Sequence, residues 1–142
     1  MSKATRSTYQ VIGDQIRLFR DRRGWTQEEL AAQVEELGVP MSNVTVARIE
    51  KAKGRKVGLS VEELLAFAAV LGVSPKNLLT PGDKGARLRL FPTIDPVDAE
   101  LVRAWIRGEN VLFDDDSWRT YSEAFSEEEW EALGWELHGG ER

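Results

Sequence analysis

The chain has 142 residues, enough for one ordinary domain or for a small domain with an appendage. It contains no cysteine, which excludes disulfide bonds and thiol chemistry, and its longest apolar run, AFAAVLGV, is too short to span a membrane. The net charge is −5, divided unevenly: residues 1–85 hold 13 Lys or Arg against 10 Asp or Glu (+3), and residues 86–142 hold 6 against 14 (−8). This acidic total does not exclude a nucleic-acid partner, which needs only a local basic face.

The first helix is predicted from Thr8 to Arg23. Gly24 ends it, and Arg22 and Arg23 lie in its last turn, where the helix dipole favours cations. Trp25 follows, and we expect it to lie in the core or to cover it. Apolar residues at helical spacing form the buried stripe of this helix: Val11, Ile12, Ile16 and Phe19.

A second helix begins after Thr26, a good N-cap, and Glu29 stands three residues later, which completes a capping box. Gly38 stops this helix, and Pro40 cannot continue it. Three apolar residues recur at helical spacing and make one apolar face of this helix: Leu30, Val34 and Leu37.

A third, short helix is capped by Ser42. Val46 and Ile49 point to one side of it, and the remaining residues are left for the other side: Asn43, Val44, Thr45, Ala47 and Arg48. A helix so small and so polar at its start contributes little to a core. It is suited to a DNA major groove, which admits one helix and offers base edges to its N-terminal side chains.

The pattern TQEEL, then G-V, then S-x-x-x-V-x-x-I-E resembles the helix-turn-helix of the Cro and phage-repressor regulators, the XRE family. The resemblance runs from about Tyr9 to Pro81. Two features depart from the short phage repressors: the segment from Leu30 to Gly38 is longer by about one helical turn, and the turn VPM before Ser42 is longer too. Both are similar to a subset of small actinobacterial regulators. The resemblance implies a five-helix, lambda-repressor-like DNA-binding domain.

The family's recognition residues match three positions here, Asn43, Val44 and Arg48. Asn can bond adenine, Arg can bond guanine, and Val can cover a thymine methyl group. The alternatives are a turn residue for Asn43 and a solvated helix face for Arg48. Ser42 and Thr45 are better placed for DNA phosphates.

Two further roles come from the same resemblance. Gln27, at the start of the second helix, matches a phosphate-binding position, and the alternative is an ordinary polar surface residue. Arg20 is expected to form an internal ion pair with Glu50, and the alternative is two unrelated surface charges.

The loop KAKGRKVGLS follows the third helix and carries four cations within six residues. Such loops usually indicate only solvation, but this one should lie near the DNA backbone because it directly follows the groove helix. We therefore expect phosphate contacts from Lys51, Lys53, Arg55 and Lys56.

A fourth helix is capped by Ser60, with Glu63 completing a capping box, and ends at Gly72. Ser74 caps a last short helix, PKNLL. We expect the core face of the fourth helix to consist of Val61, Leu64, Leu65, Ala68 and Leu71. The sequence thus predicts a mostly α fold with a helix-turn-helix domain over residues 1–81.

The composition changes after Pro81. Residues 82–94 read as a linker followed by a short strand or an extended arm. Residues 95–142 form an acidic, mainly helical C-terminal region, with a helix from Asp95 to Gly108 and shorter helices starting near residues 116 and 126. This region holds four tryptophans that could pack on the domain, form a dimer interface or hold a partner protein: Trp105, Trp118, Trp130 and Trp135.

Catalytic signals are weak. His138 is the single histidine, and Asp114 to Asp116 lack the spacing of a calcium loop. We expect no metal, no cofactor and no enzymatic activity. The N-terminus lacks the apolar segment of a secretory signal, so a cytoplasmic protein is expected.

The sequence therefore predicts a sequence-specific regulator of transcription that binds double-stranded DNA. We expect a repressor that acts as a homodimer on a roughly palindromic operator, and a phage immunity repressor is a variant of this prediction. The alternative is an antitoxin-like interaction module whose acidic C-terminal region binds a partner protein.

Overall fold

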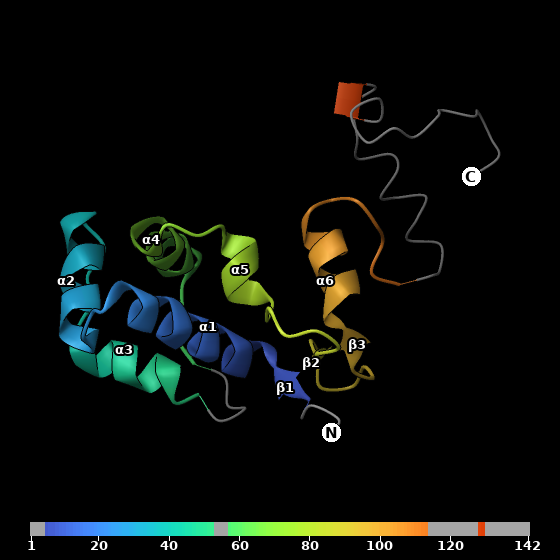
Figure 1. The fold of residues 1–142 in the computed structure, drawn as a ribbon, viewed down its shortest axis with the longest axis horizontal. Helices are drawn as coiled ribbons and strands as arrows, with labels where there is room; N and C mark the ends of the chain where they lie inside the picture. Colours follow the sequence, from blue (N-terminus) through green and yellow to red (C-terminus); the bar gives the residue numbers. More distant parts are fainter. Residues whose placement is uncertain (1–4, 53–56, 114–127, 130–142) are drawn as a thin grey trace. The chain divides into compact units, whose positions relative to one another are not determined.

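The computed structural model describes residues 5–52, 57–113 and 128–129. The chain divides into two compact units, Met1–Ala99 and Glu100–Arg142. The elements are β1 (Arg6–Ser7), α1 (Thr8–Arg23), α2 (Gln27–Glu36), α3 (Asn43–Glu50), α4 (Val61–Leu71), α5 (Pro75–Leu79), β2 (Arg87–Arg89), β3 (Val97–Asp98) and α6 (Ala99–Ile106), as Figure 1 shows. The predicted mostly helical fold with a short strand region is confirmed.

Helices α1 to α5 begin where capping residues stand in the sequence. Ser7, Thr26 and Ser60 each accept a hydrogen bond from the third helical backbone N–H, and the side chain at that position bonds back to the cap. Ser74 makes no such side-chain bond. At the C-termini of α1 and α4, Gly24 and Gly72 adopt φ of 69° and 71°, the left-handed conformation that favours glycine.

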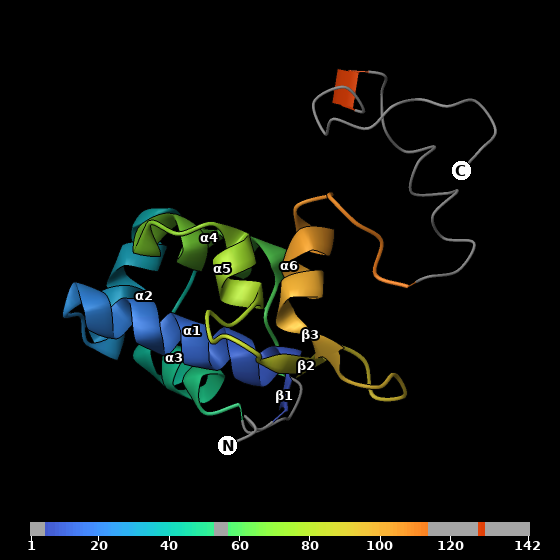
Figure 2. The ribbon, with the colours of Figure 1, turned by 45° about the vertical axis from the view of Figure 1, so that its right-hand side comes forward.

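Helix α1 is the centre of the first unit. Helix α3 lies along one side of it, and α4 and α5 lie on the other side, in both Figure 1 and Figure 2. The largest fully buried apolar side chains of these helices come from all five: Ile16, Leu30, Val34, Val46, Ile49, Phe67 and Leu78. Burial of this shared core is the main term that holds α3 in place.

Helix α4 differs from the expected pattern on one face. Val61 and Leu65 are 74% and 51% exposed, although both were expected in the core. Ala68 and Leu71 are buried as expected, and the buried stripe also includes Phe67, which lies on the same helix face. Because α4 is apolar on almost every side, the sequence did not reveal which face the bulky Phe67 would take inward. Val61 lines an open apolar groove with Tyr9 and Phe91.

A three-stranded sheet joins the chain's beginning to residues beyond the five helices. Strand β1 pairs with β2 in parallel, with Arg6 opposite Leu88, and β2 pairs with β3 in antiparallel, with Arg87 opposite Asp98. The side chain of Leu88 is completely buried. The first unit therefore extends beyond residue 81, where the sequence analysis placed a linker.

The helix predicted from Asp95 is wrong at its start. Residues Val97–Asp98 pair with β2, and the helix begins only at Ala99, whose N–H donates to the carbonyl of Ala86. Pro96, which was expected at the first helical position, therefore lies directly before a strand. The predicted helices near residues 116 and 126 lie outside the described residues.

No helix in the described part of the chain combines the length and the apolar character that crossing a bilayer requires.

Candidate nucleic-acid interface

Helix α3 has two faces of opposite character. Val46 and Ile49 are completely buried, whereas Asn43 and Arg48 are exposed and Val44 is 72% exposed. At 3.6 residues per turn, Val44 and Arg48 fall on the side of the helix opposite to the buried pair, and Asn43 lies at the edge of this exposed face, three residues before Val46. Ala47 lies between the exposed side chains on that side. Its small size leaves the backbone of α3 accessible to a close neighbour.

The start of α3 is held by two hydroxyl groups. Ser42 Oγ accepts from the N–H of Thr45 at 3.2 Å, and the two hydroxyl oxygens lie 3.1 Å apart in a hydrogen bond. Ser42 is exposed and Thr45 is half-buried. The two side chains share one hydroxyl proton between them, which leaves the other proton available to a ligand oxygen. The cap thus serves the helix and still offers a donor at its N-terminus.

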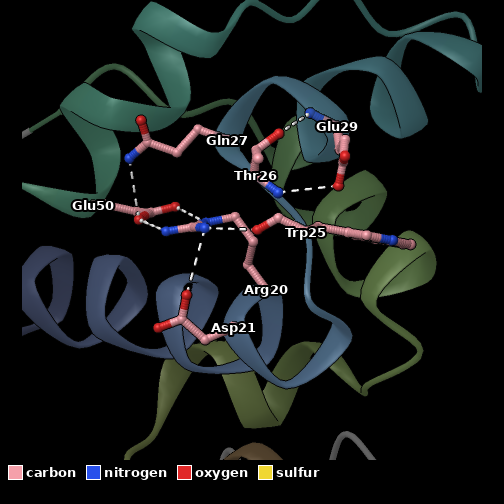
Figure 3. Close-up of polar contacts among 7 residues, drawn as sticks. All are labelled: Arg20, Asp21, Trp25, Thr26, Gln27, Glu29 and Glu50. Atoms are coloured by element: carbon pink, nitrogen blue, oxygen red, sulfur yellow. Dashed lines mark hydrogen bonds and ion pairs between the residues drawn. The ribbon is translucent and has the colours of Figure 1, made fainter.

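The end of α3 is held by an ion pair with α1 (Figure 3). Arg20 Nε and Nη2 donate to the two carboxylate oxygens of Glu50, each at 2.8 Å, and Arg20 Nη1 donates to the carbonyl of Trp25 at 2.8 Å. Asp21 lies 3.4 Å from the guanidinium. The Arg20 and Glu50 side chains are only 11% and 4% exposed. The pair expected from the resemblance is therefore present, with the forked geometry that a guanidinium and a carboxylate favour.

The pKa of Arg20 is raised above its ordinary value, first because its side chain donates to Glu50 and then because the Glu50 charge is close, although burial opposes the shift. Arginine is charged at any physiological pH in either environment. The raised pKa matters here as a sign that the guanidinium interacts strongly with Glu50, and the pair is a geometric restraint on α3.

Gln27 joins the same network from α2. Its side-chain nitrogen donates to Glu50 Oε1 at 3.3 Å, as Figure 3 shows, and its side chain is half-buried. An amide nitrogen carries two N–H groups, so this bond leaves one of them for a phosphate oxygen. The neighbouring Glu28 and Glu29 place negative charge in the first turn of α2, which weakens the attraction of this helix end for phosphate.

Of the four loop cations, the structure describes Lys51, which follows α3 directly and is exposed. Lys53, Arg55 and Lys56 lie outside the described residues. Among the tryptophans, Trp105 is an exposed residue of α6. The other three expected interface residues lie outside the described part: Trp118, Trp130 and Trp135.

One exposed basic residue close to α3 was not among the predicted DNA contacts. Arg17 is exposed on α1, four residues after Gly13 and three before Arg20, so it falls on the stripe of α1 that faces α3. That spacing was visible in the sequence. It had no meaning until the contact between α1 and α3 was known.

The helical part of the chain is similar in sequence to known proteins. A family model described as a helix-turn-helix domain matches residues 11–79. A curated relative, "Neisseria hypothetical transcription factor" from Neisseria meningitidis serogroup B (strain MC58), is 31% identical over 78 residues, which span 55% of this chain and 66% of the relative. The crystal structure of a hypothetical transcription factor from Neisseria is also 31% identical; the match covers 53% of this chain and 77% of that chain, with a TM-score of 0.45.

The narrower resemblance to the Cro and phage-repressor class stays a prediction, because the matched family model is described only as a helix-turn-helix domain. The broader prediction of a helix-turn-helix domain is confirmed by the family model, and the curated relative supports it. Residues 11–79 match a helix-turn-helix domain, and this part of the chain is similar to a hypothetical transcription factor.

Proposed function

We propose that this protein binds double-stranded DNA in a sequence-specific way and regulates transcription from the sites that it binds, acting in the cytoplasm. In this proposal α3 enters the major groove, with Asn43, Val44 and Arg48 at base edges. Gln27, Ser42, Thr45 and Arg17 contact phosphates near the ends of α2 and α3, and the cations from Lys51 to Lys56 contact the DNA backbone beyond α3.

One observation carries the proposal: α3 is fully buried at Val46 and Ile49, while Asn43, Val44 and Arg48 on the rest of its surface are exposed to solvent. Val44 adds a small apolar surface to this otherwise polar face, where it could cover a thymine methyl group. A helix with an amide, a guanidinium and a small apolar side chain on one face can read adenine, guanine and thymine.

The decisive experiment is selection of duplexes from a random-sequence pool by the full-length protein. We expect a defined motif to be enriched by the wild-type protein and lost when Asn43, Val44 and Arg48 are replaced together by alanine. The matched control replaces Val61, Leu65 and Lys84 by alanine, which also removes one positive charge and two further exposed side chains. Enrichment of the same motif by the α3 variant would contradict the proposal.

A single substitution tests the register of α3. Arg48→Ala should weaken binding to the enriched duplex by about 1–3 kcal/mol and relax the preference at one base position. A variant that weakened all sequences equally would assign Arg48 to a phosphate.

The loop after α3 has a different signature. Replacement of Lys53, Arg55 and Lys56 by glutamine should weaken binding to all sequences alike and make the slope of log affinity against log salt less negative. An unchanged slope would remove these residues from the interface.

We further propose that the protein is a repressor and a homodimer. Eight residues of α3 span about 12 Å, so one α3 reaches only a few base pairs, and two copies would read two half-sites about 34–36 Å apart. The C-terminal region holds four tryptophans, a residue type enriched at interfaces, and three of them follow Phe113. Sedimentation of the full chain and of a chain ending at Phe113 should give a dimer and a monomer. A stable foreign protein that co-purifies through residues 86–142 would favour the antitoxin-like alternative instead.

A further inference from the structure

Gly13 occupies the interior of α1, six residues into a helix of 16. Glycine weakens a helix interior relative to alanine, so its presence there calls for a reason. The reason lies in the neighbouring helix. A Cβ atom at this position would lie 2.4 Å from the carbonyl oxygen of Ile49 and 3.2 Å from the Cα of Glu50. Both are backbone atoms of the last turn of α3, which cannot move aside as the tip of a side chain could.

The same turn of α3 is held at a second point on α1. Glu50 places its Cα against Gly13 and its carboxylate on Arg20, which is seven residues further along α1. Seven residues correspond to about 10.5 Å along a helix axis. Glu50 is therefore fixed sterically at one point and by a forked ion pair at the other. Together the two contacts define how close the end of α3 comes to α1 and in which direction it runs.

We propose that Gly13 is a positioning residue for DNA recognition: it lets the last turn of α3 come close enough to α1 for Arg48 and Val44 to face the bases correctly. This inference rests on the proposed function and deepens it. Hydrogen bonds to base edges tolerate errors of only a few tenths of an ångström. Phosphate contacts from flexible lysine and arginine side chains tolerate more, because these side chains can adjust.

The expected signature is therefore a loss of specificity that exceeds any loss of general DNA affinity. The experiment measures the dissociation constants of full-length Gly13→Ala for two duplexes. One is the duplex that the wild-type protein enriches from a random pool, and the other has an unrelated sequence. We expect binding to the enriched duplex to weaken by about tenfold or more, and binding to the unrelated duplex to change by less than about twofold.

The matched control is Gly82→Ala. A Cβ at Gly82 meets nothing within 4 Å, and its backbone does not adopt a left-handed conformation. This variant should bind both duplexes as the wild type does. A second readout is the NMR signal of the Arg20 Nε–H group, which donates to Glu50. It should shift in Gly13→Ala and stay in place in Gly82→Ala, because only the first substitution displaces Glu50.

If Gly13→Ala does not fold, Arg20→Lys decides the question, because it keeps the charge, loses the forked pair and adds no steric clash. A selective loss of affinity for the enriched duplex would then support the proposal. The proposal would be overturned if the variant measured, Gly13→Ala or Arg20→Lys, lost affinity for both duplexes equally or lost no affinity at all. Failure of the wild-type protein to enrich any sequence would overturn the proposed function itself, whereas enrichment by the wild type with unchanged binding by Gly13→Ala would overturn only the role of Gly13.

Discussion

Helix α1 is anchored at its two ends by contacts of different kinds. Toward its C-terminus, Arg20 pairs with Glu50, and both side chains are nearly removed from water. At its N-terminus, Arg6 of β1 pairs with Asp14 at 2.7 Å and with Asp83 at 3.3 Å, and these two carboxylate side chains are 50% and 42% exposed. The junction between β1 and β2 at this end of α1 is also stabilised by Leu88, whose side chain is completely buried.

The two ends of α1 therefore have different roles: the contact at its C-terminal end orients α3, and the contacts at its N-terminal end add to the stability of the fold. A buried ion pair must be desolvated, which cancels much of its attraction, but it permits only one geometry. An exposed pair contributes little and is screened by salt. The α1–α3 contact therefore fixes the direction of the proposed recognition helix, and the sheet contributes mainly through Leu88. The following variants test this division.

The largest effect is expected from Glu50→Ala. The substitution removes the carboxylate partner of a nearly buried guanidinium, so it should lower the free energy of unfolding by about 3–5 kcal/mol. Urea denaturation measures this change. The matched control is Glu36→Ala, which removes an exposed carboxylate at the end of α2 and should change stability by less than about 0.5 kcal/mol. Equal effects from the two variants would mean that the ion pair does not hold α3.

Leu88→Ala should have the next largest effect. It leaves a cavity where a completely buried leucine joins β1 to β2, at a cost of about 2–4 kcal/mol in the free energy of unfolding. Leu65→Ala, at a half-exposed position, is the control and should cost far less. If the sheet does not orient α3, the ratio of affinities for enriched and unrelated duplexes will stay at its wild-type value in folded Leu88→Ala. A changed ratio would show that the two junctions are coupled.

The five helices were predictable because their signals are local. Two helix starts are indicated by capping boxes that span four residues each, Thr26 with Glu29 and Ser60 with Glu63. Two helix ends are indicated by glycines, Gly24 and Gly72. The two faces of α3 follow from the spacing of Val46 and Ile49 alone. The fold of this part was therefore visible in the sequence.

The sheet and the contacts around Gly13 depend on partners far along the chain. Strand β1 has two residues, and nothing in them indicates pairing with Leu88, some eighty positions later. The strand at Val97–Asp98 displaced a helix start that Pro96 had favoured locally, because pairing with β2 satisfies the backbone there. The importance of Gly13 appears only when the backbone of α3 is seen beside it.

The smallest effect is expected from Arg6→Gln. Its two ion pairs involve half-exposed carboxylates, so their loss should lower the free energy of unfolding by about 0.2–1 kcal/mol. The control Lys84→Gln removes the same charge from a nearby exposed position. Because exposed charges are screened, the difference between Arg6→Gln and Lys84→Gln should shrink toward zero in about 1 M salt, whereas the cost of Glu50→Ala should persist. A double-mutant cycle of Arg6→Gln with Asp14→Asn isolates the contribution of the 2.7 Å pair itself. A coupling energy well above about 1 kcal/mol that survives high salt would show that the N-terminal junction is also held by a specific ionic contact, and the distinction between the two ends of α1 would no longer hold.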